Sequence, residues 1–84
     1  MAYKYQKEVL IMQYGRVCSL CKRKLKKKEV TAHHIIPKSE GGSSEILNLC
    51  ICCEKCQIKI HKHKYGSKEY SEFTEEILRN LGRI

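Results

Sequence analysis

The chain has 84 residues, of which 17 are Lys or Arg and 9 are Glu, so its formal net charge is +8. It contains no Asp, which excludes mechanisms built on an aspartate dyad or on an Asp-bound magnesium cluster. No apolar run approaches the roughly 18 residues that span a bilayer, and the N-terminus lacks the layout of a signal peptide. We therefore expect a soluble, cytoplasmic protein that does not contact membranes.

The N-terminal segment has the pattern of a short amphipathic helix over residues 3–14, which Gly15 can end. Its spacing predicts one packing face, made of Tyr5, Val9 and Met12, with Ile11 as a further candidate. A Cys-x-x-Cys unit at residues 18–21, here called the knuckle, follows, and then a strongly basic run over residues 22–28.

The middle of the chain favours two short strands around a loop. Residues 29–36 are rich in β-branched side chains and stop before Pro37. Residues 38–45 have loop composition, with permissive backbone at a Gly-Gly pair, and residues 46–52 are strand-like.

Two more helices are predicted. The first follows Cys53 and runs to about Tyr65, where Gly66 can close it. The last spans residues 71–81, with Ser71 as its N-cap. The order of elements predicts a small α+β domain.

The cysteines predict a metal site. A domain of this size buries little surface, and without a secretory signal paired Cys-x-x-Cys units favour zinc over disulfides. Two such units would complete a closed, structural four-thiolate zinc site: Cys18, Cys21, Cys53 and Cys56. Cys50-x-x-Cys53 is an alternative second pair, and otherwise Cys50 and Cys52 are expected to be buried small residues.

The histidines suggest a second site. His33-His34 ends the first strand-like segment, whereas Gln57 and His61 are spaced to share one face of a helix. Adjacent residues on a regular strand point to opposite faces, so the strand must twist or end if both imidazoles serve one site. His63 is expected to face DNA or solvent rather than to bind metal.

With these residues in place, the chain resembles a known family. The layout CSLC…HHIIPKSEGGSSEILNL…CEKCQIKIH is similar to that of the HNH endonucleases, which have a ββα-metal fold with a Cys-pair zinc site. The resemblance covers about residues 15–64. It implies a single HNH nuclease domain over residues 1–84, stapled by structural Zn²⁺, with the helices at 3–14 and 71–81 as additions.

The resemblance also implies roles for individual residues. His34 matches the general base, and Asn48 matches the residue whose amide or backbone carbonyl holds the His34 ring. His33 matches the first metal ligand, and His61 matches a ligand one helical turn beyond the third letter of the motif. Gln57 stands where that third letter is usually His, which leaves open whether Gln57 binds metal directly, through water, or not at all.

The implied cofactor is one catalytic divalent metal, Mg²⁺, Mn²⁺, Ni²⁺ or Zn²⁺, in addition to the structural Zn²⁺. Imidazole ligands shift the preference away from magnesium. The implied partner is DNA, and small members of the family in phages or mobile elements can act with a packaging or recombination protein. The best phosphate-contact residues lie near the motif: Lys38, Lys55, Lys59, Lys62 and Lys64.

Two rival functions are compatible with the sequence. One is a zinc-stapled nucleic-acid-binding module that has lost catalysis through Gln57. The other is a structural zinc ribbon that binds a protein, a reading that leaves His33, His34 and His61 without a role. Only the endonuclease requires a second divalent-metal site.

Overall fold

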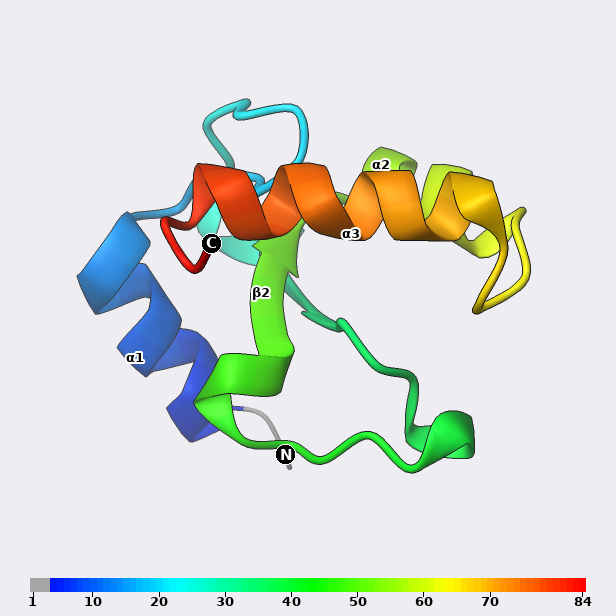
Figure 1. Cartoon of the computed structure of the whole chain (residues 1–84). Helices are drawn as coiled ribbons and strands as arrows, with labels where there is room; N and C mark the ends of the chain where they lie inside the picture. The colour runs from blue at the N-terminus through cyan, green and yellow to red at the C-terminus, as the bar shows by residue number, and fades with distance from the viewer. Residues whose placement is uncertain (1–3) are drawn as a thin grey trace.

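The computed structural model describes residues 4–84, which form three α-helices and a two-stranded antiparallel sheet (Figure 1). In chain order the helices and strands are α1 (Lys4–Tyr14), β1 (Thr31–His34), β2 (Leu49–Cys52), α2 (Glu54–His61) and α3 (Lys68–Asn80). This is the α+β class that the sequence predicts. None of these helices combines the length and apolarity needed to cross a membrane.

The sheet separates the two adjacent histidines. β1 pairs with β2 so that His33 lies opposite Cys50 and His34 opposite Leu49. Because side chains alternate along a strand, one face of the sheet carries Thr31, His33, Cys50 and Cys52, and the other carries Ala32, His34, Leu49 and Ile51. The His33 and His61 rings lie 5.6 Å apart, so α2 covers the His33 face.

Each helix contributes a buried aliphatic side chain to one core: Leu10 from α1, Ile60 from α2 and Ile77 from α3. In Figure 1, α3 crosses β2, and α1 lies on the side of β2 away from α2. The buried apolar cluster has 15 residues, of which five are cysteines. A core so poor in large side chains is the kind that a metal site has to reinforce.

The last two helices do not lie where the sequence predicts. α2 ends at His61 rather than near Tyr65, because the following backbone tightens and the His63 N–H bonds to the Ile60 carbonyl at 3.0 Å. α3 begins at Lys68, since Ser67 rather than Ser71 is its N-cap. The Ser67 hydroxyl accepts the Tyr70 N–H at 3.2 Å.

Both strands are shorter than predicted. The Glu29 carboxylate accepts the Lys26 N–H at 2.8 Å, which holds residues 27–29 in a 3₁₀ turn before β1 begins. β2 begins only at Leu49, because the Asn48 N–H bonds to the Glu45 carbonyl at 2.9 Å and closes another 3₁₀ turn. A third 3₁₀ turn, Lys38–Glu40, lies within the predicted loop.

The predicted packing face of the first helix is wrong at Tyr5 and Met12, although Ile11 does pack against the core. Tyr5 is 73% exposed and Met12 is 86% exposed, whereas Leu10 is fully buried. Apolar residues occupy positions 9–12 consecutively, so they surround this helix and do not define one face. Helix α1 begins at Lys4, and residue 3 of the predicted helix lies outside the described residues.

Candidate functional site

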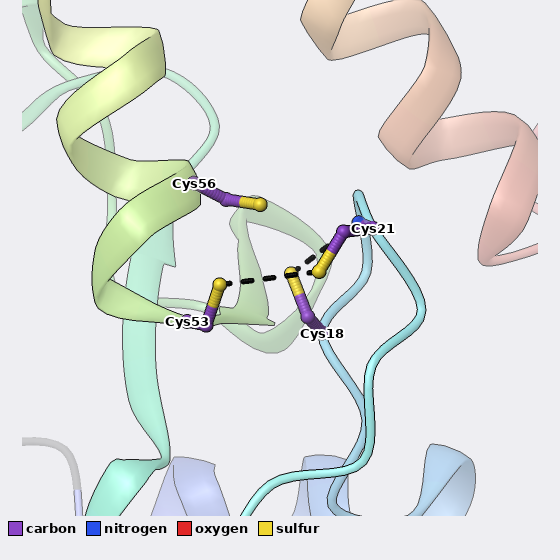
Figure 2. Close-up of side chains that lie close together, drawn as sticks. All are labelled: Cys18, Cys21, Cys53 and Cys56. Atoms are coloured by element: carbon purple, nitrogen blue, oxygen red, sulfur yellow. Dashed lines mark hydrogen bonds between the residues drawn. The ribbon is translucent and has the colours of Figure 1, made fainter.

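The knuckle and the start of α2 bring four cysteines together. The Sγ atoms of Cys18, Cys21, Cys53 and Cys56 all lie within 4.8 Å of one another. Figure 2 shows the first pair reaching the cluster from the knuckle and the second pair from the start of α2. Tetrahedral zinc–thiolate bonds of about 2.3 Å require sulfur–sulfur separations of about 3.8 Å. The Cys21 and Cys53 sulfurs are already 4.0 Å apart, so these residues fit a structural zinc ion.

Local backbone geometry explains how the knuckle presents its sulfurs. The Cys21 N–H points at the Cys18 Sγ at 3.5 Å, and the Lys22 N–H bonds to the Cys18 carbonyl at 2.9 Å. Lys22 takes the left-handed conformation with φ of 64°, which turns the chain tightly enough for both sulfurs to face one point. Cys53 is the N-cap residue of α2, and Cys56 lies on the first turn of that helix.

A fifth sulfur adjoins this cluster. A hydrogen bond from the Cys52 side chain, with smaller contributions from backbone N–H groups, lowers the pKa of Cys18 to about 3. The same bond raises the pKa of Cys52, so Cys52 stays a thiol and donates to a Cys18 thiolate. Cys50 lies outside the four-sulfur group, and its Sγ is 3.8 Å from that of Cys52. The structure thus gathers Cys53 and Cys56 rather than the Cys50/Cys53 alternative.

On the same face of the sheet, His33 meets His61. The His33 side chain is only 2% exposed, and its Nδ1 is buried without a hydrogen-bond partner among the described residues. Burial, followed by the nearby His61 and His34 rings, lowers the pKa of His33 to about 4. The ring is therefore neutral at pH 7 and keeps a lone pair, which a cation bound between His33 and His61 would use.

His34 lies on the opposite face of β1, at the end of the strand. Its Nε2 is 3.4 Å from the Ser44 hydroxyl, which returns from the long loop. Partial burial, and then the charge of Lys38, lower the pKa of His34. Its imidazole is consequently more often neutral near pH 7 than a free histidine would be.

Asn48 fixes the loop that follows His34. Its Oδ1 accepts the Ile36 N–H at 2.9 Å, and its Nδ2 donates to the Ile36 and Ser43 carbonyls at 3.1 and 2.7 Å. Its backbone carbonyl accepts the Ile35 N–H at 2.9 Å. A Cβ added at Gly42 would lie 1.8 Å from the Ile36 carbonyl oxygen, so only glycine permits this close approach. Asn48 thereby acts on the backbone directly after His34.

We expect Asn48→Ala to lower the free energy of unfolding by about 2 kcal/mol, because three side-chain hydrogen bonds are lost at once. Urea unfolding followed by circular dichroism measures this. The matched control is Leu47→Ala, whose side chain is 78% exposed and should change stability by less than about 0.5 kcal/mol. Equal stability of the two variants would contradict the role of Asn48 as a loop anchor.

Gln57 lies on α2 one turn before His61. Its Nε2 donates to the Thr31 hydroxyl, which in turn donates to the Cys52 carbonyl at 2.6 Å. This leaves the Gln57 carbonyl oxygen as the group with which it can meet a cation. Thr31 was not singled out from the sequence, although its spacing of two from His33 on a strand places both on one face.

The five lysines predicted to contact phosphate are all exposed. Lys38 follows Pro37 in the 3₁₀ turn and acts electrostatically on His34. Lys55 and Lys59 lie on α2, and Lys62 and Lys64 in the turn beyond it. His63, in the same turn, was expected to face DNA or solvent. It is instead half-buried, and its ring lies 5.8 Å from that of Phe73.

Comparison with known proteins identifies one family. The model of a family described as HNH endonuclease matches residues 18–76, a segment that contains all four clustered cysteines and the three histidines of the proposed site. Anaredoxin from Nostoc sp. is 47% identical to this chain over 34 residues. That similarity covers 40% of this chain and 45% of Anaredoxin, so the chain matches less than half of that relative's length.

Proposed function

The chain belongs to the HNH endonuclease family, and from this premise we propose that it is a metal-dependent endonuclease that hydrolyses phosphodiester bonds of DNA. The observation that carries the proposal is the buried, unpartnered Nδ1 of His33 beside the His61 ring. An orphaned polar atom in a buried place costs about 1–3 kcal/mol, and a bound cation removes that cost.

In this proposal two metals have different roles. The four-cysteine group holds Zn²⁺ and serves structure, because no ligand position remains open. His33 and His61, with the Gln57 carbonyl as a weaker third group, hold a divalent ion. When bound, that ion supplies electrostatic stabilisation for the charge that develops on the phosphate and on the departing 3′ oxygen.

His34 supplies the general base. Its neutral imidazole takes a proton from the water that attacks phosphorus, and the lowered pKa of His34 favours the neutral form. Asn48 keeps the backbone after His34 in place, which fixes the direction of the ring. By the family resemblance, the products carry 5′-phosphate and 3′-hydroxyl ends.

DNA is the proposed substrate because exposed lysines lie near the proposed site. Lys38 acts electrostatically on His34. Lys55 and Lys59 lie on the same helix as His61. Each lysine on a phosphate contributes affinity that falls with salt but carries no sequence information. Weak sequence preference is therefore expected unless a partner, such as a phage packaging or recombination protein, directs cutting. A cytoplasmic location is part of this proposal.

We expect the cleavage rate to follow the titration of His34. A base must be unprotonated to act, so the rate should fall as pH drops through a pKa below the ordinary value of 6.5. Lys38→Gln removes a charge that lowers this pKa and should move the profile to higher pH. A pH–rate profile with the metal held saturating measures both effects, and an identical profile in the variant would contradict the electrostatic role of Lys38.

Gln57→His should tighten binding of the catalytic divalent ion by roughly tenfold, or about 1.4 kcal/mol, because an imidazole is a stronger ligand than an amide. Titration of zinc-loaded protein with Mn²⁺ or Ni²⁺ by calorimetry measures this. Gln57→Ala is the control, and it also loses the bond to Thr31. If the histidine and alanine variants bind these ions equally, position 57 is not a ligand position.

The experiment that tests the function is cleavage of supercoiled plasmid by zinc-loaded protein with magnesium, manganese, nickel or no added ion. We expect nicking or linearisation only with added ion, and more with manganese or nickel than with magnesium. DNA that is bound but intact in every lane would replace this proposal with the catalytically impaired binding module.

A further inference from the structure

A groove of about 430 Å³ lies between α1 and the start of β1, and of the residues described above for the candidate functional site only Thr31 lines it. Helix α1 forms one wall through Lys4, Lys7 and Ile11. These positions are spaced by three and four residues, so they share one face of the helix. Lys27 and Ala32 belong to the opposite wall, where the basic run leads into β1.

The charges on this groove are unbalanced. Three lysines line it, and Glu8 is the one acidic residue among the lining side chains. The Lys7 Nζ lies 3.5 Å from the Val30 carbonyl, a neutral acceptor at the limit of hydrogen-bond length. Ammonium groups gathered around one hollow repel one another, and a polyanion bound there relieves that repulsion.

The groove opens on the same side of the sheet as His34. Ala32, which lines the groove, and His34 are two residues apart on β1 and share a face. Ser44 then connects α1 to His34. The Gln6 Nε2 donates to the Ser44 carbonyl at 3.3 Å, and the Ser44 hydroxyl is 3.4 Å from the His34 Nε2. Through these two contacts, helix α1, which carries Lys4 and Lys7, is linked to the proposed general base, His34.

We propose that the groove between α1 and β1 binds the phosphate backbone of one DNA strand next to the cleavage point. The choice of DNA as ligand rests on the proposed function. Half of the residues that line the site lie on α1, which precedes the segment 18–76 matched by the family. Lysines bind the phosphates, and the apolar floor of Ile11 and Ala32 contacts the sugars. The first helix thus extends the DNA-binding surface beyond the lysines around α2.

The test is binding of fluorescent single-stranded and duplex oligonucleotides to the zinc-loaded full chain, with no catalytic ion added. Lys4→Gln/Lys7→Gln should weaken single-strand binding roughly tenfold at about 0.1 M salt, and should reduce the salt slope by about 1.4, or 0.7 for each phosphate contact. The matched control is Lys68→Gln/Arg79→Gln, which removes the same charge from exposed positions on α3. Equal losses in both variants would mean that the overall charge, and not the groove, binds DNA.

A substitution that leaves the charge unchanged tests whether DNA occupies the groove itself. Ala32→Phe fills the groove without changing charge and should also weaken binding, whereas unchanged binding in folded, zinc-loaded protein overturns the proposal. Lysine acetylation of wild type gives a test that needs no variant. Bound oligonucleotide should protect Lys4, Lys7 and Lys27 while Lys68 stays reactive, and equal reactivity with and without oligonucleotide overturns the proposal.

These readouts are independent of cleavage. Protein that binds through the groove but cuts no plasmid contradicts the endonuclease and leaves the groove standing. If the wild type cuts plasmid and the Lys4→Gln/Lys7→Gln variant binds DNA as tightly as wild type, only the proposed DNA binding in the groove is contradicted.

Discussion

Cys56→Ala should lose the structural zinc and its cooperative unfolding transition, whereas Cys50→Ala should keep both. The two thiols are similarly buried, at 4% and 0% exposure, but only Cys56 belongs to the four-sulfur group. A structural zinc ion contributes on the order of 10–16 kcal/mol, which matches or exceeds the whole stability of a small domain. Loss of one thiolate therefore removes the link between the knuckle and α2.

Zinc per chain and thermal unfolding by circular dichroism distinguish these variants. Cys50→Ala leaves a small cavity and should cost only about 1 kcal/mol. The reverse outcome, with zinc lost from Cys50→Ala and kept in Cys56→Ala, would support the alternative Cys50-x-x-Cys53 pair. Retention of zinc and of the unfolding transition in both would contradict the proposed structural site.

His34→Ala should reduce the single-turnover rate of DNA cleavage by about 10²–10⁴-fold, the usual contribution of a general base, while DNA binding is kept. His34 is partly exposed at the end of β1, so its loss should not unfold the domain. The control is His63→Ala, which removes an imidazole packed beside Phe73 and outside the proposed site. Equal cleavage rates in wild type and His34→Ala would exclude His34 as the base.

Short-range patterns predicted the family and the four-cysteine group. The resemblance to the HNH endonucleases is confirmed by the family match over residues 18–76. The Cys-x-x-Cys units and the pair Gln57 and His61 each join residues only three or four positions apart. Such short separations, within about one turn of a helix, can be read directly from the sequence. The expectation that a regular strand would direct His33 and His34 to opposite faces agrees with the structure, in which both residues are paired in the ladder.

The sequence pattern did not predict contacts between residues that are far apart in the chain. The Tyr70 hydroxyl donates to the Ile35 carbonyl at 3.1 Å, which ties α3 to the segment directly after His34, and nothing in the order of residues predicts this pairing. Ser71 was predicted as the N-cap of the last helix, whereas Ser67, four residues earlier, caps α3 in the structure. The burial of Leu10 was not predicted, because its neighbours on α1 are also apolar.

The sheet also separates the groups to which the proposal gives different roles. His33 and His61, the proposed ligands of the divalent ion, lie on the α2 side of the sheet. His34 and the lysine-lined groove lie on the other face, on the side of α1. His34 is the last residue of β1, and its Nε2 lies near the Ser44 hydroxyl on that face.

The most direct measurement is Mn²⁺ binding, read by electron paramagnetic resonance on zinc-loaded protein, with DNA cleavage recorded in the same samples. We expect one bound Mn²⁺ in addition to the zinc, a cleavage rate that rises with Mn²⁺ occupancy, and a parallel loss of both in His61→Ala but not in His63→Ala. Full cleavage with no ion bound beyond zinc, or unchanged Mn²⁺ binding in His61→Ala, would contradict the proposed catalytic metal site.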